Sequence, residues 1–165
     1  MVIGGISMYA YHVITDRPLQ IGQQIIFDEE HHNGVYQRVY AKKQIVEDIY
    51  ANPGQYSAEN LEYPVLVALR ELALEEVRVK KHPEYPSRMS CLYVSGTQKE
   101  AEGKCFVGDA TKCFDGQTDK EENIRLAELY WENKSNDSEE RSICEMLVDG
   151  CITIVEFVKV INANV

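Results

Sequence analysis

The sequence predicts an α+β fold in which a small mixed or antiparallel sheet is combined with helices grouped in the middle of the chain. Runs rich in β-branched and aromatic residues lie near both ends, whereas the longest amphipathic patterns lie between them. The elements therefore do not alternate evenly as they would in a doubly wound sheet. The length of 165 residues, with 44% hydrophobic and 27% charged residues, predicts a single domain over residues 1–165.

The first third of the chain predicts two extended segments and one helix. Residues 8–15 mix aromatic and β-branched side chains around His12, which is typical of a strand. Residues 24–27 follow a glycine turn and predict a second extended segment, after which an acidic stretch with two histidines indicates a loop. Residues 39–50 predict a helix, because Val39, Lys43, Val46 and Tyr50 recur at mixed helical spacing. The Asn-Pro-Gly sequence at 52–54 is a helix stop.

The middle third predicts the longest helix and the central strand. Residues 64–80 begin with a proline and carry an apolar stripe at helical spacing. Residues 82–88 contain two prolines and are expected to be irregular. Residues 89–94 predict a buried strand, and a capping-box pattern predicts a short helix over 97–103.

The last third predicts a helix followed by a hairpin. Residues 105–107 indicate a strand fragment, residues 121–131 a helix, and residues 133–141 a polar loop. The final two β-rich runs, 143–148 and 151–161, are separated by Asp-Gly, which is a strong hairpin signal.

Charge and hydropathy exclude several classes of function. The 27 acidic and 17 basic residues give a net charge of −10, which repels nucleic-acid phosphates and argues against a nucleic-acid partner. The densest basic stretch, residues 78–81 with Arg88 nearby, indicates a solvated helix end. No apolar run approaches the roughly 18 residues that span a bilayer, and the first six residues lack a basic residue. We therefore expect no membrane association and a cytoplasmic location.

Metal-binding and redox motifs are absent from the sequence. The five cysteines are an odd number without a C-x-x-C pair, which indicates free thiols. His31 and His32 are adjacent rather than one helical turn apart, so they do not indicate a metal site. The glycine-rich dinucleotide and phosphate loops, G-x-S-x-G and H-E-x-x-H are also absent.

A dispersed set of segments carries a family resemblance. They are YHVITDRPLQIGQQI, PSRMSCLYVS followed by KEAE, and AELYWEN with ICEMLVDG. In this order they resemble an uncharacterised bacterial and phage domain family whose layout is similar to ADP-ribosyltransferases of the His, Tyr, Glu type. The resemblance covers most of the chain from Tyr11 to Glu156, and it implies an ADP-ribosyltransferase-like fold with NAD as substrate.

The resemblance implies catalytic roles for His12, Tyr93 and Glu145. Glu145 would stabilise the oxocarbenium-like centre while holding a ribose hydroxyl, and His12 would hydrogen-bond a ribose hydroxyl. The ring of Tyr93 would stack on nicotinamide. Arg88, with its planar fork, would pair with the dinucleotide phosphates, and Thr15 is the remaining residue assigned to cofactor binding.

Each of these residues also has an ordinary structural interpretation. His12 is then a hydrogen-bonded core residue, Tyr93 a sheet-packing side chain and Glu145 an exposed strand position, while Arg88 pairs with a surface acid. The chain also departs from the family, because KEAE leads directly to GKCFVGD. This shortening after Glu102 predicts an incomplete floor of the NAD cleft.

Three functions follow from these observations. The first is an ADP-ribosyltransferase-like domain that transfers ADP-ribose to a macromolecule, such as a protein acceptor, or hydrolyses NAD. The alternative is a non-catalytic protein-interaction domain, a phage or defence-system component on a degenerate transferase-like fold, whose acidic surface binds a basic protein partner. An RNA-modifying transferase is the third, and the net charge argues against it. Glu156 on the last predicted strand competes with Glu145 for the glutamate role.

Overall fold

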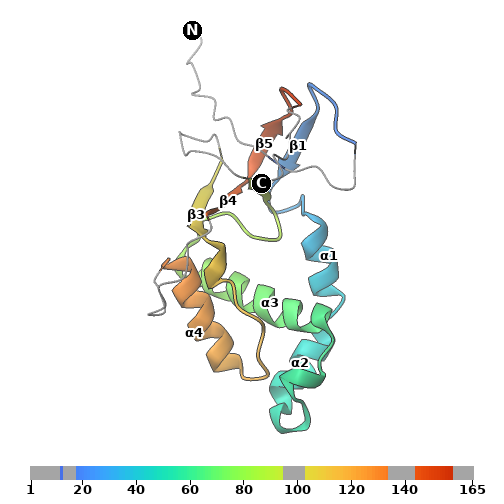
Figure 1. Cartoon of the computed structure of the whole chain (residues 1–165), viewed down its shortest axis with the longest axis vertical. Helices are drawn as coiled ribbons and strands as arrows, with labels where there is room; N and C mark the ends of the chain where they lie inside the picture. Colours follow the sequence, from blue (N-terminus) through green and yellow to red (C-terminus); the bar gives the residue numbers. More distant parts are fainter. Residues whose placement is uncertain (1–11, 13–17, 95–102, 134–143, 158–165) are drawn as a thin grey trace, which may run out of the picture.

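The α+β class is confirmed by the computed structural model, which describes residues 12, 18–94, 103–133 and 144–157. These residues form four α-helices and two small antiparallel sheets, with the strands in the upper part of Figure 1 and most of the helical layer below them. The strands are β1 (Gln24–Phe27), β2 (Leu92–Val94), β3 (Cys105–Asp109), β4 (Cys144–Val148) and β5 (Gly150–Thr153). The helices are α1 (Gly34–Tyr40), α2 (Lys43–Ala51), α3 (Tyr63–Lys81) and α4 (Lys120–Trp131).

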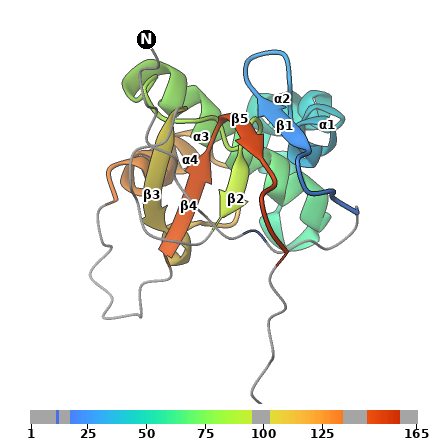
Figure 2. The ribbon, with the colours of Figure 1, turned by 90° about the horizontal axis from the view of Figure 1, so that it is seen from above.

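The two sheets are connected through β4 and β5, which are consecutive in the chain but belong to different sheets. β4 lies between β2 and β3 in a three-stranded sheet, where Leu147 is opposite both Tyr93 and Phe106. β5 follows β4 directly but pairs with β1, with Gly150 opposite Phe27. Figure 2 shows β3, β4 and β2 side by side, and the pair of β5 and β1 beyond them.

The predicted hairpin at Asp149 and Gly150 is wrong, because β4 and β5 pair with different strands. Gly150 has a φ of 87°, a left-handed conformation that glycine adopts without strain. This residue bends the chain from one sheet into the other. The Asp149 carboxylate accepts a hydrogen bond of 2.6 Å from the backbone N–H of Lys104, which fixes the bend against the start of β3. An Asp-Gly pair signals a tight change of backbone conformation, and it does not determine which strand the following residues pair with.

The two long helices form as predicted. α3 begins with Pro64 in its first turn, and α4 begins after Asp119, whose carboxylate caps the backbone N–H groups of Glu121 and Glu122. The helix predicted over residues 39–50 is instead two helices, because the chain turns between Tyr40 and Lys43. Asn33 caps the first of them, which begins at Gly34 rather than at the predicted Val39.

The core has two parts on either side of α3. Leu74 and Val77, in the C-terminal half of α3, pack with Phe106, Leu147 and Trp131 between the helices and the three-stranded sheet. The indole N–H of Trp131 donates to the backbone carbonyl of Leu74 at 2.8 Å, so this large side chain is buried without an unpaired donor. The N-terminal half of α3 packs on α1 and α2 through Leu69, Val39 and Ile49 among other residues.

The connection before β2 is irregular, as its prolines predict, and it continues to Cys91. The central strand is therefore limited to Leu92–Val94, shorter than the predicted 89–94. Asn33 holds this connection by donating to the carbonyls of Arg88 and Cys91 at 2.8 and 3.0 Å. Of the predicted strand 8–15, only His12 is among the described residues. Most of the predicted helix 97–103 and most of the predicted polar loop 133–141 also lie outside the described residues. Among the described residues no helix is long and apolar enough to cross a membrane.

Candidate functional site

Arg88 is the centre of a buried polar cluster beneath the three-stranded sheet. The side chain is held by the irregular connection between α3 and β2, and its residue is only 6% exposed. Its Nε donates to Glu71 Oε2 at 2.9 Å, and its Nη1 donates to Glu145 Oε1 at 2.5 Å. Nη1 is also 2.5 Å from the hydroxyl of Tyr130. One guanidinium thus connects α3, α4 and β4.

Glu71 and Tyr130 are the parts of this cluster that the sequence interpretation missed. Glu71 lies on the buried face of α3, one turn from Ala68 and one turn from Leu74, and it is 2% exposed. A carboxylate at a core-facing position of a helix is stable only if a partner compensates its charge. The spacing of Glu71 from Ala68 and Leu74 in the sequence could therefore have indicated a buried ion pair. Tyr130 is buried near the end of α4, and its hydroxyl donates to Glu145 Oε1 at 2.5 Å.

Glu145 presents its two oxygens differently. Oε1 receives both Arg88 Nη1 and the Tyr130 hydroxyl. Oε2 has no hydrogen-bond partner within the described parts of the chain. The side chain is 16% exposed, against 2% for Glu71. Glu145 is therefore an oriented carboxylate with one anchored oxygen and one oxygen that no described residue contacts by a hydrogen bond.

Tyr93 and His12 extend the cluster toward solvent. The Tyr93 hydroxyl donates to the backbone carbonyl of Arg88 at 3.0 Å, and the Arg88 guanidinium lies 5.3 Å from the centre of the Tyr93 ring. His12 Nδ1 lies 2.8 Å from the backbone carbonyl of Tyr93. Because a carbonyl can only accept, Nδ1 carries the proton in this contact, and Nε2 of the exposed ring is directed elsewhere.

The electrostatics of the cluster keep its tyrosines neutral and its arginine charged. Burial raises the pKa of Tyr130 well above its ordinary value, and Arg88 opposes this effect while Glu145 adds to it. Burial likewise raises the pKa of Tyr93 and of Cys113, whose sulfur is 3.7 Å from Arg88 Nη2. Burial alone would lower the pKa of Arg88, but Glu71 and its other neighbours raise it well above the ordinary value.

The structure brings four of the predicted residues together. Arg88 contacts both Tyr93 and Glu145, and His12 joins them through the Tyr93 carbonyl. Thr15 lies outside the described residues. Glu156 follows β5 in an exposed segment without regular secondary structure, so the described contacts associate Glu145 with the cluster.

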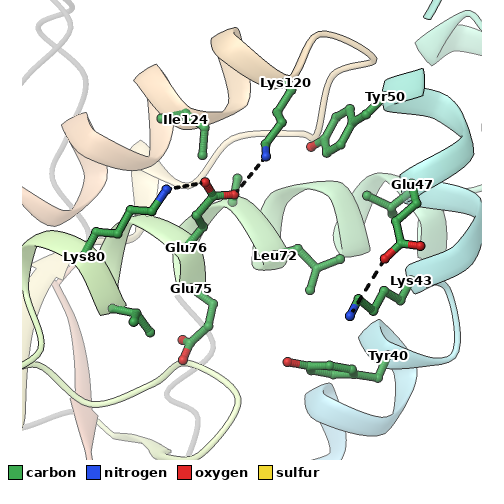
Figure 3. Close-up of a pocket in the computed structure, with 13 residues that line it drawn as sticks. Tyr40, Lys43, Glu47, Tyr50, Leu72, Glu75, Glu76, Lys80, Lys120 and Ile124 are labelled. Atoms are coloured by element: carbon green, nitrogen blue, oxygen red, sulfur yellow. Dashed lines mark hydrogen bonds and ion pairs between the residues drawn. The ribbon is translucent and has the colours of Figure 1, made fainter. Parts of the chain in front are cut away.

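Two cavities lie away from this cluster. The helical cavity, about 410 Å³, lies between α2, α3 and α4 (Figure 3), and its lining includes Val46, Tyr50, Leu72, Lys120 and Ile124. The strand-junction cavity, about 870 Å³, lies near the bend between β4 and β5, and its lining includes Phe27, His32, Tyr36, Ser90 and Asp149. Neither is lined by His12, Arg88, Tyr93 or Glu145. The described residues contain no group of three or more His, Cys, Asp or Glu that could hold a metal ion.

The chain belongs to the family described as "Protein of unknown function (DUF2441)", whose profile matches residues 10–103. The match includes His12, Glu71, Arg88 and Tyr93 and ends before Tyr130 and Glu145. No curated protein matches the chain. The family description states no activity.

Proposed function

We propose that this protein is an ADP-ribosyltransferase-like domain that binds NAD beside Glu145 and transfers ADP-ribose to a macromolecule or to water. The observation that carries the proposal is the series of contacts from His12 to Tyr93, from Tyr93 to Arg88, and from Arg88 to Glu145. His12, the segment that carries Arg88 and Tyr93, and Glu145 are far apart in the sequence. The resemblance associates three of them with one reaction, and their proximity supports that association.

Glu145 carries the catalytic role in this proposal. Cleavage of the bond between nicotinamide and ribose develops positive charge at the ribose C1′, which a fixed carboxylate stabilises. Arg88 and Tyr130 hold Oε1, so Oε2 is the oxygen available to a ribose hydroxyl. The carboxylate is thereby oriented before the nucleotide binds, which reduces the reorganisation that the reaction requires.

His12 and Tyr93 position the nucleotide. His12 is exposed, and its Nδ1 contact with the Tyr93 carbonyl leaves Nε2 for a ribose hydroxyl. Tyr93 is partly buried against the core beside Arg88, and we keep the nicotinamide-stacking role for its ring. The phosphate-binding role that the resemblance implies for Arg88 is not part of this proposal, because its guanidinium is buried and contacts Glu71, Glu145 and Tyr130. Arg88 is a positioning residue for Glu145.

The covalent step is a substitution at the ribose C1′. The bond from C1′ to the nicotinamide nitrogen breaks, and its electron pair leaves with neutral nicotinamide. A nucleophilic atom of the acceptor, or the oxygen of water, forms the new bond to C1′ and releases one proton. Hydrolysis therefore gives ADP-ribose, nicotinamide and a proton from NAD and water.

A second candidate is a non-catalytic protein-interaction domain. The observation that favours it is the mutual satisfaction of Arg88, Glu71 and Glu145, since a buried ion cluster of this kind also serves purely to fix helices against a sheet. The two candidates differ in whether the protein consumes NAD.

Nicotinamide release from NAD tests the proposal, with Glu145→Gln as the key variant. Gln retains an oxygen acceptor but removes the negative charge, so we expect a loss of about 100-fold or more in kcat, comparable to removing one electrostatic stabiliser from an active site. Glu156→Gln is the matched control and is expected to keep the wild-type rate. No release by the wild-type protein, or equal rates in all three proteins, would overturn the catalytic assignment and favour the interaction domain.

A further inference from the structure

The helical cavity and the strand-junction cavity adjoin across α3, and the two together are called the groove. Both are lined by Tyr40, Glu75 and Val79, so they meet at these three residues. Figure 3 shows Tyr40 and Glu75 at one edge of the helical cavity, with the phenol directed toward the carboxylate. Val79 is 57% exposed where the two cavities adjoin.

A ladder of stacked aromatic rings contributes to the strand-junction half. The ring centres of His32 and Tyr36 are 3.7 Å apart at 9°, and those of Tyr36 and Tyr40 are 4.3 Å apart at 29°. His32 is fixed by a 2.5 Å hydrogen bond to the hydroxyl of Ser90. All three rings line this cavity. The faces between the stacked rings are covered, so the contact surface for a ligand is at the end of the ladder, where Tyr40 is 41% exposed. The face of a tyrosine ring attracts cations, and planar guanidinium groups in particular.

The charges of the strand-junction half select a cationic group. Glu75 is already neutralised by Arg78, which donates to its two oxygens at 2.6 and 3.0 Å. The lining also holds the carboxylates of Asp28, Glu29 and Asp149, with Lys104 as the other cation. Asp28 Oδ1 lies 2.7 Å from His31 Nδ1, and Asp149 accepts the backbone N–H of Lys104, so the three carboxylates still outnumber the one lysine. This half of the groove therefore carries a net negative potential beside the aromatic ladder.

The helical half of the groove has a different character. Its lining includes the apolar side chains of Val46, Leu72, Ala73 and Ile124. Two carboxylates of its rim are paired with lysines, since Glu76 lies 2.7 Å from Lys80 and 3.2 Å from Lys120 (Figure 3). Glu47 likewise lies 3.8 Å from Lys43, so the pairs leave one positive charge in excess and no free carboxylate among them. This half suits an uncharged apolar side chain.

We propose that the groove docks an extended segment of a partner protein that carries an arginine and a nearby apolar residue. The arginine occupies the strand-junction half between the aromatic ladder and the carboxylates, and the apolar side chain occupies the helical half. A nucleic acid does not fit, because its phosphates would face the carboxylates. This inference goes beyond NAD binding and holds whether or not the protein is an enzyme, since none of the proposed catalytic residues lines the groove.

Fluorescence anisotropy with labelled peptides tests the proposal on the full chain. The probe is a short peptide with an arginine and a leucine separated by two glycines, and its relatives replace arginine by citrulline or leucine by glycine. We expect each replacement to weaken binding about fivefold or more, which corresponds to about 1 kcal/mol. Equal binding of the arginine and citrulline peptides would overturn the proposal. So would displacement of the probe by spermidine at equal concentration, because that would identify a site for small polyamines.

Matched charge variants locate the binding site. The double variant Asp28→Asn, Glu29→Gln removes two carboxylates from the groove, whereas Glu59→Gln, Glu62→Gln removes two exposed carboxylates that line neither cavity. We expect only the first pair to weaken peptide binding. Val79→Lys, which places an ammonium at the meeting point of the two halves, is expected to weaken it as well. Equal weakening by both double variants would show a general charge effect and contradict the groove assignment.

Discussion

At the scale of single residues, the most constrained group is Arg88. A buried guanidinium is costly to desolvate, and this cost is offset only if nearly every donor has an acceptor. The carboxylates of Glu71 and Glu145 and the hydroxyl of Tyr130 supply those acceptors from α3, β4 and α4. The same contacts orient Glu145, so the stability of the fold and the geometry of the proposed site depend on one side chain.

Replacing Arg88 by Met is expected to destabilise the protein by about 3–5 kcal/mol, because Glu71 then stays buried without its bidentate partner. Arg125→Met is the control, since Arg125 is 54% exposed and pairs with Glu122 on the surface of α4. This control should leave the stability close to the wild-type value, because the exposed ion pair is screened by solvent. Urea unfolding measures both values, and equal costs would contradict the structural role of the buried cluster.

The sequence identified part of this residue-scale arrangement. It singled out His12, Tyr93, Arg88 and Glu145, which the structure links in series through the Tyr93 carbonyl and the Arg88 guanidinium. The roles that the resemblance assigns to them stay predictions. Glu71 was missed because a charged residue on a helix is ordinarily expected on the solvated face, although its spacing of three residues from Ala68 and from Leu74 places it on the buried one. The buried location of Arg88 was missed for another reason, since its neighbouring prolines indicate an irregular connection, and only the three-dimensional packing brings it against α3.

At the scale of elements, the bend between β4 and β5 determines how the two sheets are joined. Asp149 lies at this bend, half-buried, and accepts the backbone N–H of Lys104. The helices α3 and α4 were predictable because their apolar spacing and first-turn residues agree. The strand partners were not, because the pairing of β5 with β1 depends on long-range contacts that local patterns do not encode.

The bend gives a pH-dependent prediction for Asp149→Asn. Burial raises the pKa of Asp149, with Lys104 opposing, so the folded state favours the protonated form. The wild-type side chain therefore contributes most favourably at acidic pH, and this contribution is lost as the pH rises above about 4 through the folded-state pKa. The stability of Asp149→Asn relative to wild type should increase between acidic and neutral pH in urea unfolding.

Glu76→Gln is the comparison, because the pKa of Glu76 is shifted in the opposite direction to that of Asp149. Its hydrogen bond with Lys80 is the largest of the effects that hold the pKa of Glu76 below its ordinary value. Stability from this carboxylate is present at neutral pH and is lost as the pH falls through the folded-state pKa. Glu76→Gln should therefore be less stable than wild type at neutral pH, with a smaller difference at acidic pH. The same pH trend in both variants would contradict the assigned pKa directions.

At the scale of the whole molecule, the groove and the cluster are separate features of one α+β fold. The cluster lies between the three-stranded sheet and the helices, whereas the groove crosses α3 between the bend of β4 and β5 and the helices α2 and α4. A protein that engages a partner in the groove and a nucleotide beside Glu145 could do both at once. The acidic composition was evident in the sequence, but its concentration beside an aromatic ladder required the fold.

The central claim, an NAD site beside His12 and Glu145, is tested most directly by thermal unfolding with and without millimolar NAD. Ligand bound only by the folded state raises its stability, by about 2.7 kcal/mol when its concentration is 100 times Kd. We predict a higher melting temperature with NAD for wild type and for His31→Ala, an exposed histidine outside the cluster. His12→Ala should lose the shift. No shift in the wild-type protein, or an equal shift in both histidine variants, would contradict the account.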